Sequence, residues 1–236
     1  MTRFSNRSDA GKRLAEELSK HKEFSDAVVL ALARGGVPVG LEVAEALQVP
    51  LDVFVVRKLG VPGHEELAMG AIASGDVVGW NEDILRGLNL SRTMRDRVVA
   101  REKEELRRRE SAYRGGRPPL DIQGKIVIVV DDGLATGASM RAAVSAVRAK
   151  QPSRIVVAVP VAPPETCGSF KALADEVICL MTPRPFSAIG LWYADFSQTS
   201  DEEVCRLLEQ ANNLFQHRRK HSETGEKHDY ESRIAG

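Results

Sequence analysis

Short apolar runs alternate along this chain with segments in which apolar residues recur at helical spacing. The runs are rich in valine, isoleucine and leucine and do not alternate with polar residues, which is the pattern of strands buried on both faces of a parallel sheet. Strands that alternate with helices predict an α/β fold, a parallel-sheet core with helices on both faces. The predicted strands are residues 27–32, 53–56, 126–130, 154–161 and 176–180, and the predicted helices are residues 8–21, 37–47, 140–150, 165–174 and 201–215.

Other segments depart from this alternation. Glycine and proline after the second predicted strand indicate a mobile loop that could close as a lid, and a Ser-Gly-Asp turn between two short apolar runs indicates a hairpin. A long, highly charged stretch ending in Gly-Gly-Arg-Pro-Pro predicts an exposed helix. These segments are the loop at 59–64 with its lid at 60–66, the hairpin at 68–73 and 77–80, and the charged helix at 91–113.

The last part of the chain has two further features. Aromatic residues gather in a segment at about 181–200, which predicts a small C-terminal hood over the end of the sheet. Residues 216–236 are polar and predict a disordered tail. We therefore expect a single domain over residues 1–215.

The stretch with the most specific chemistry follows the apolar run 126–130. Two carboxylates stand where this strand emerges, and a loop of small residues leads into the next predicted helix. Small side chains let several backbone N–H groups face one point, and a helix N-terminus favours an anion. Amides and hydroxyls there could hold a phosphate while the carboxylates accept hydrogen bonds from vicinal hydroxyls, so we predict a site for a phosphorylated sugar. Its residues are Asp131, Asp132, Gly133, Leu134, Ala135, Thr136, Gly137, Ala138 and Ser139.

The stretch from Val129 to Met140 resembles the phosphoribosyl pyrophosphate signature of the type I phosphoribosyltransferase family: an apolar strand, two acids and a short loop containing Thr-Gly. A Walker loop would need Gly-Lys-Ser/Thr, whereas Ala138 follows Gly137, and the loop has no Gly-x-Gly-x-x-Gly pattern. The resemblance implies an enzyme that transfers ribose 5-phosphate from phosphoribosyl pyrophosphate to a nitrogen nucleophile of a small-molecule acceptor, such as a nucleobase, with release of pyrophosphate. It also implies Mg²⁺, with Asp131 and Asp132 as catalytic residues and as metal ligands.

A second loop follows the first predicted strand, with the sequence Arg34-Gly35-Gly36. Glycines at a strand end permit a close approach of the backbone to a ligand, and Arg34 adds a fixed positive charge. In the family that the chain resembles, the equivalent loop holds the pyrophosphate. Two more cations, Arg57 and Lys58, end the next strand, and we expect them to take part in catalysis by neutralising pyrophosphate oxygens.

The acceptor is harder to predict. In the family members that act on 6-oxopurines, an acidic residue occupies the position of Ala135 and faces the base, and an alanine side chain cannot replace it. Aromatic residues follow the last predicted strand, where the family's hood lies, and Trp192 is our candidate for stacking on a planar base. The other aromatic residues there are Phe186, Tyr193 and Phe196. Packing in the core or in a subunit interface is the alternative for each of them.

Composition permits this interpretation without adding to it. The chain has 236 residues, 43% of them hydrophobic, which suffices for one domain with an apolar core. Its 33 basic and 33 acidic residues balance, so no global field favours nucleic acid or an anionic membrane. The basic helix at 91–113 carries Glu/Arg pairs at helical spacing, which indicates a solvated surface rather than an RNA site.

Three cysteines, at 167, 179 and 205, are an odd number without Cys-x-x-Cys spacing, which suggests a reducing cytoplasm rather than disulfides. The chain begins without an apolar targeting segment, and no apolar run approaches the ~18 residues that cross a bilayer. We expect a cytoplasmic protein without a membrane partner, assembled as a homo-oligomer, in the simplest case a dimer. Two functional classes stay open: a phosphoribosyltransferase, or a non-catalytic protein that senses phosphoribosyl pyrophosphate or a nucleotide on the same fold.

Overall fold

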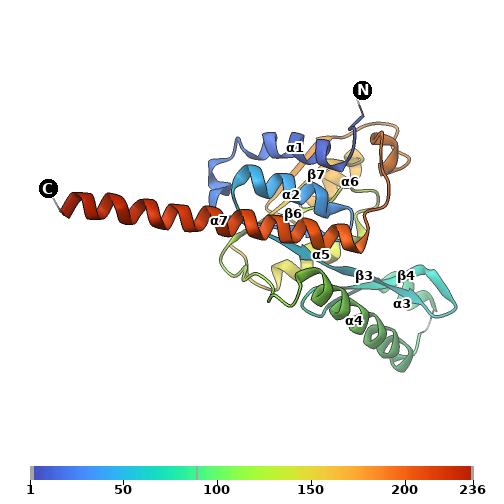
Figure 1. Ribbon diagram of the computed structural model, residues 1–236. Helices are drawn as coiled ribbons and strands as arrows, with labels where there is room; N and C mark the ends of the chain where they lie inside the picture. The colour runs from blue at the N-terminus through green and yellow to red at the C-terminus, as the bar shows by residue number, and fades with distance from the viewer. Residues whose placement is uncertain (1–2, 89, 235–236) are drawn as a thin grey trace.

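The structure is a computed structural model that describes residues 3–88 and 90–234 (Figure 1). Its core is a five-stranded sheet in the order β2-β1-β6-β7-β8, with every neighbouring pair parallel. The predicted α/β class is confirmed, and each predicted core strand overlaps an observed one. The second is displaced, since it was predicted at 53–56 and lies at 51–54, and Val56 begins a strand of another sheet. The strands are β1 (Ala27–Leu32), β2 (Leu51–Phe54), β6 (Ile126–Val130), β7 (Arg154–Val161) and β8 (Glu176–Met181).

Helices cover both faces of this sheet, and the side chains of each strand alternate between them. Val28 and Leu30 of β1 pack with α5, whereas Val29 between them packs with α1 and α2. The same alternation holds along β6 and β7, so both faces bury valine and isoleucine. Full burial of each such side chain is worth about 1.5–3 kcal/mol. The covering helices are α1 (Arg7–Leu18) and α2 (Gly36–Leu47) on one face and α5 (Ala138–Arg148) and α6 (Pro164–Phe170) on the other, with a 3-10 turn η1 (Lys22–Asp26) before β1.

The predicted lid loop is instead part of a second sheet. The strands β3 (Val56–Val61), β4 (His64–Ala73) and β5 (Val77–Trp80) form an antiparallel ribbon, and the predicted hairpin joins β4 to β5. Strands β3 and β4 continue pairing up to Val61 and His64, within the segment expected to be a loop. Leu59 and Val61 are buried in the cluster shared with α4 and α7, which explains why this segment is ordered.

Two helices follow the ribbon. The short α3 (Glu82–Leu88) has no buried residue and was not predicted. The charged helix is confirmed as α4 (Arg92–Arg114), with the Ser91 hydroxyl accepting a hydrogen bond from the Met94 N–H at 3.2 Å as its N-cap. It lies beside β3 and α7 (Figure 1).

The last helix, α7 (Asp201–Ile234), is longer than predicted, because it continues from residue 215 to Ile234. Its first turns pack on α2 and α4 through Val204, Leu207, Leu208 and Ala211. Beyond them the helix projects from the body of the protein (Figure 1). Residues 216–234, which were expected to be part of a disordered tail, therefore extend a helix already nucleated by packing, and adding residues to an existing helix is easier than starting one. The last two residues of that predicted tail, 235–236, lie outside the described residues.

The cysteine prediction was wrong. Cys167 on α6 and Cys179 on β8 form a disulfide, and Cys205 is a free thiol. The two cysteines are 12 residues apart in sequence, and packing of α6 against β8 brings them together. Sequence spacing alone did not reveal this contact. In the part of the chain that the structure describes, no helix has both the length and the apolar composition of a membrane span.

Candidate functional site

The two loops singled out in the sequence meet at one edge of the core sheet. Strands β1 and β6 are neighbours, and Ala31 pairs with Val130 near their carboxyl ends. A Cβ atom on Gly35 would lie 2.1 Å from Oδ2 of Asp132, and one on Gly36 would lie 2.8 Å from the carbonyl oxygen of Val130. The two loops therefore contact each other at Gly35 and Gly36, where the side chain of any other residue would clash with the loop after β6.

The peptide bond between Ala33 and Arg34, at the start of the first loop, is cis. The Arg34 side chain points toward the start of α7, where Nη1 lies 3.5 Å from Oδ1 of Asp201. The Tyr113 hydroxyl donates to the same oxygen at 2.7 Å. Burial, and then this hydrogen bond, raise the pKa of Tyr113 to about 12. Asp201 on α7 thus holds the Arg34 side chain beside the loop, and Tyr113 on α4 binds the same carboxylate.

The two acids after β6 lie in a desolvated setting. Burial, and then the charge of Asp132, raise the pKa of Asp131 well above its ordinary value. Burial also raises the pKa of Asp132, against the opposing effect of Arg7. The charged forms of both acids are therefore less favourable in the free protein than in water, and positive charge or hydrogen-bond donors from a ligand would favour them.

Backbone contacts hold Asp132 firmly. Its N–H donates to Oδ1 of Asp131 at 2.9 Å, and its carbonyl oxygen accepts a hydrogen bond of 2.5 Å from the Tyr193 hydroxyl. Tyr193 is buried in the aromatic hood, and this burial raises the pKa of its hydroxyl. The hood thus reaches the backbone of the acid pair.

The small-residue loop after the acids is anchored at two points and exposed between and beyond them. The Leu134 N–H donates to the Val161 carbonyl at 2.9 Å, and Gly137 has φ +75°, with the Phe170 ring where a Cβ atom would lie. Helix α5 begins at Ala138, and the N–H groups of its first turn have no acceptor within the helix. These features are typical of a site for an anionic group. The exposed residues are Ala135, Thr136, Ala138 and Ser139.

Arg57 and Lys58, expected to act together, point to opposite faces of the ribbon because neighbouring residues of a strand alternate. Arg57 donates to Oε2 of Glu102 on α4, at 2.9 Å from Nε and 2.5 Å from Nη2. Lys58 shares its face with Val56, which packs against the cluster that contains α5. Its exposed Nζ lies 3.3 Å from Oε2 of Glu66. The structure therefore does not bring Arg57 to the face on which Lys58 lies.

The hood is built from residues 181–200 and includes a 3-10 turn, η2 (Ile189–Trp192). Trp192 is half-buried and stacks on Phe186, with ring centroids 6.4 Å apart. Its indole Nε1 is buried and, within the described chain, has no hydrogen-bond partner. The hood contacts the small-residue loop through Ile189, whose Cγ2 would lie 2.8 Å from a Cβ atom on Gly133. Ile189 was not predicted to contact this loop, because no motif in the neighbouring sequence indicates such a contact.

Arg7 is a second residue that the sequence analysis missed. Its Nε lies 2.8 Å from Oδ2 of Asp132, and both side chains are nearly buried, with exposed fractions of 12% and 11%. The two residues are 125 positions apart, and Arg7 is the first residue of a helix that was predicted to begin after it. No pattern in the sequence around either residue indicates a contact between positions so far apart in the chain.

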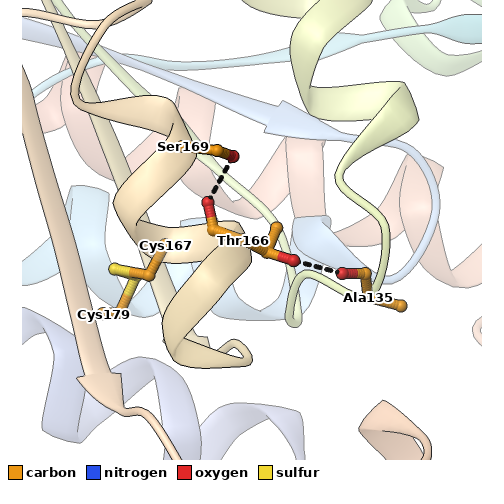
Figure 2. The surroundings of a disulfide bond; sticks show 5 residues. All are labelled: Ala135, Thr166, Cys167, Ser169 and Cys179. Atoms are coloured by element: carbon orange, nitrogen blue, oxygen red, sulfur yellow. Dashed lines mark hydrogen bonds between the residues drawn. A yellow bond between two sulfur atoms is a disulfide. The ribbon is translucent and has the colours of Figure 1, made fainter.

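Helix α6 supports the small-residue loop from the side, as Figure 2 shows. The Thr166 hydroxyl donates to the carbonyl oxygen of Ala135 at 2.8 Å, and the next residue, Cys167, is bonded to Cys179 on β8 (Figure 2). The disulfide therefore ties the helix that contacts the loop to the edge strand of the core sheet.

Cys179→Ser is expected to lower the melting temperature by roughly 5–10 °C, because an entropic crosslink over a loop of this size is worth about 2–3 kcal/mol. Differential scanning calorimetry with and without dithiothreitol measures the effect. Dithiothreitol should lower the melting temperature of the wild type but leave that of Cys179→Ser unchanged. Cys205→Ser, which alters the free thiol, is the matched control. Equal melting temperatures for the wild type in oxidising and reducing buffer would contradict the prediction.

The chain matches the family described as Phosphoribosyl transferase domain over residues 3–185, which is most of its length. It therefore belongs to this family, and the resemblance to type I phosphoribosyltransferases found in the sequence is confirmed.

Two proteins of Mycobacterium tuberculosis, from strains CDC 1551 / Oshkosh and ATCC 25618 / H37Rv, are each 46% identical to the chain over 215 residues. Both are named "Putative phosphoribosyl transferase". The match covers 91% of this chain and 48% of each relative, so the chain spans about half the length of the curated relatives it matches. The crystal structure of TT1426 from Thermus thermophilus is 44% identical with a TM-score of 0.76, covering 88% of this chain and 98% of that one.

Proposed function

We propose that the protein is an enzyme that transfers ribose 5-phosphate from phosphoribosyl pyrophosphate to a nitrogen nucleophile, a nucleobase or a similar small molecule, with Mg²⁺ and with release of pyrophosphate. The observation that carries this proposal is the contact of the Gly35–Gly36 backbone with Asp131 and Asp132. Through this contact, a loop suited to pyrophosphate and a loop suited to ribose 5-phosphate form one site.

Each part of the site has a role in the proposal. The amides and hydroxyls of residues 135–139 hold the 5-phosphate, and Asp131 and Asp132 accept hydrogen bonds from the ribose hydroxyls. The loop of residues 34–36 holds the pyrophosphate, and we propose that Arg34 and the exposed Lys58 neutralise its charge. Arg57 is left out of the catalytic set, because its guanidinium is committed to Glu102.

The donor set fits magnesium. Among the described residues, no three histidine, cysteine or acidic side chains cluster as a cage for a metal ion. Mg²⁺ commonly binds through one or two carboxylates together with the phosphates of a substrate, and Asp131 and Asp132 would supply such oxygens. When bound, the ion would neutralise charge on the pyrophosphate and so make it a better leaving group.

Charge explains how the residues would favour the reaction. As the bond between the anomeric carbon and pyrophosphate breaks, positive charge develops on the ribose and negative charge on the leaving group. The two desolvated acids interact more favourably with a cationic sugar than with a neutral one. Their stabilisation is therefore larger in the transition state than in the ground state, which is the condition for catalysis.

For the acceptor, the proposal rests on Ala135. This residue is exposed on the small-residue loop and has no group that exchanges a proton or accepts a hydrogen bond through its side chain. We expect the enzyme to disfavour 6-oxopurines relative to bases that do not need an acidic partner at this position.

Pyrophosphate release in the presence of phosphoribosyl pyrophosphate, Mg²⁺ and a panel of nucleobases tests the proposal. At least one base should release pyrophosphate in proportion to the nucleotide formed, and 6-oxopurines should be poor acceptors. The Asp131→Asn, Asp132→Asn double variant is the negative control. Tight binding of phosphoribosyl pyrophosphate without turnover on any base would instead identify a sensor, and absence of binding would reject both functions.

A further inference from the structure

We propose that Arg7 is a positioning residue of this site, which fixes the Asp132 carboxylate and couples it to the aromatic hood. The inference rests on the proposed function in that its ligand is phosphoribosyl pyrophosphate. It assigns a role to a residue of the N-terminal helix, outside both of the loops that form the site.

Arg7 makes three contacts at once. Nε donates to Oδ2 of Asp132 at 2.8 Å, and Nη1 donates to the carbonyl oxygen of Ser197 at 2.6 Å. The guanidinium also lies 3.9 Å from the centre of the Phe196 ring. A planar guanidinium with donors in fixed directions can satisfy two acceptors while stacking on a ring, and a lysine ammonium cannot reproduce this combination.

The ion pair also adjoins the loop proposed for pyrophosphate. A Cβ atom on Gly35 would lie 3.3 Å from Nε of Arg7, in addition to its close approach to Asp132. Arg7 therefore lies where the first loop, the second acid and the hood converge. Because a nearly buried carboxylate without a partner is costly, loss of Arg7 would leave Asp132 free to reorient toward water.

The N-terminal segment is itself fastened to the hood, which gives Arg7 a defined place. The Phe4 N–H donates to the carbonyl oxygen of Trp192 at 2.9 Å, and the Ala194 N–H donates back to the carbonyl oxygen of Phe4 at 2.7 Å. The Phe4 ring packs on Tyr193, with centroids 5.4 Å apart. The Asn6 side chain then accepts from the Asp9 N–H and starts α1. Backbone pairing, an aromatic contact and a helix cap thus precede and position the arginine.

Oδ2 of Asp132 is occupied by Arg7, whereas the Asp131 side chain has no cation within ion-pair distance among the described residues. This asymmetry divides the roles of the acids. Asp132 is oriented by the protein, and Asp131 is left for the ribose hydroxyls of the ligand and for Mg²⁺. Asp132 would meet the ribose hydroxyls of phosphoribosyl pyrophosphate, which pyrophosphate lacks. A residue that acts through Asp132 should therefore affect binding of phosphoribosyl pyrophosphate more than binding of pyrophosphate alone.

Calorimetric titration tests the proposal. The ligands are phosphoribosyl pyrophosphate and inorganic pyrophosphate, each with Mg²⁺. The variants are Arg7→Gln, Arg7→Lys, Asp132→Asn and the Arg7→Gln, Asp132→Asn double variant. Arg7→Gln should weaken binding of phosphoribosyl pyrophosphate about 10-fold or more, and should weaken binding of pyrophosphate by a clearly smaller factor. Arg7→Lys should restore part of the loss. In the Asp132→Asn background, Arg7→Gln should have little further effect, since its action passes through that carboxylate.

Arg13→Gln is the matched control. Arg13 lies on the same helix, pairs with Asp9 and stands over the Phe4 ring at 5.3 Å, but it does not contact the acids. Two outcomes would overturn the proposal. Equal losses of affinity for both ligands in Arg7→Gln would show a general structural role. An undiminished effect of Arg7→Gln on affinity in the Asp132→Asn background would show that Arg7 contacts the ligand directly.

Hydrogen exchange of the ligand-free protein supplies a readout that does not depend on the proposed function. Arg7→Gln should accelerate exchange in residues 195–199, and Arg13→Gln should not. If the wild-type protein failed to bind phosphoribosyl pyrophosphate, the proposed function would be rejected, while this exchange would still show whether Arg7 holds the hood. Unchanged exchange and unchanged binding in Arg7→Gln would overturn the role of Arg7 alone.

Discussion

Asp131→Asn is expected to abolish most of the affinity for phosphoribosyl pyrophosphate and to raise the melting temperature of the ligand-free protein. Binding should weaken roughly 10- to 100-fold, since charge-assisted hydrogen bonds are worth about 1.5–3 kcal/mol. The melting temperature should rise because the substitution removes a carboxylate that is desolvated and repelled by its neighbour. A gain of about 1 kcal/mol corresponds to about 2–4 °C in a chain of this size.

The gain in stability should depend on pH with a definite sign. The pKa of Asp131 is raised in the folded protein, so between its ordinary value of 3.8 and its folded value the folded state binds more protons than the unfolded state. The wild type therefore loses stability as pH rises through that window. Asp131→Asn escapes this loss, so its advantage should be absent near the lower end of the window and largest above the folded pKa.

Calorimetric titration and thermal unfolding from acid to neutral pH measure both effects. Asp83→Asn, an acid on α3 whose side chain is 89% exposed, is the control and should change neither quantity. Unchanged affinity in Asp131→Asn would remove this residue from the proposed site. A lower melting temperature at neutral pH would show that the folded protein stabilises the Asp131 carboxylate.

Gly35→Ala is expected to destabilise the protein by about 1–3 kcal/mol, as overpacking does, and to impair binding of phosphoribosyl pyrophosphate and of pyrophosphate together. The new methyl group would stand 2.1 Å from Oδ2 of Asp132, an atom held in place by Arg7. Gly35 has φ −61° and ψ −29°, which alanine adopts without strain, so the effect is purely steric. The loop must move away from the acid, and the two halves of the site separate.

Chemical denaturation and the same titrations measure this prediction. Gly87→Ala on α3 is the control, because a Cβ atom there meets nothing within 4 Å and alanine is the better helix former. Wild-type stability and affinity in Gly35→Ala would show that the two loops are not packed through this glycine. Loss of affinity for phosphoribosyl pyrophosphate alone would place the defect at the acids rather than in the pyrophosphate loop.

The core of this fold could be predicted from sequence because strands buried on both faces consist of continuous runs of apolar residues. The apolar residues of β1, β6 and β7 match the predicted strands at both ends. The two loops of the site follow from that sheet, since parallel neighbouring strands end at the same edge. Gly35 and Asp132 are far apart in sequence, and the order of β1 and β6 alone brings them together.

Other features depend on contacts that a linear pattern does not contain. Arg57 and Lys58 look like one basic pair, yet strand alternation and the buried Glu102 of α4 separate them. The segment after them has glycine and proline and was predicted to be mobile, but its apolar residues are buried against α4. Arg7 and the disulfide were missed for the same reason, because each joins segments whose proximity is a result of the fold.

The approach of two loops through uncovered main chain has an evolutionary consequence. Atoms of the peptide group are the same whatever residue carries them, so the part of the edge formed by Gly35 and Gly36 cannot be retuned by exchanging side chains. Larger residues at these two positions would clash with the neighbouring loop rather than change which ligand the edge prefers. Substitutions that alter the ligand preference of this edge are therefore expected in the aromatic segment at 181–200 and at Ala135 rather than at Gly35 and Gly36.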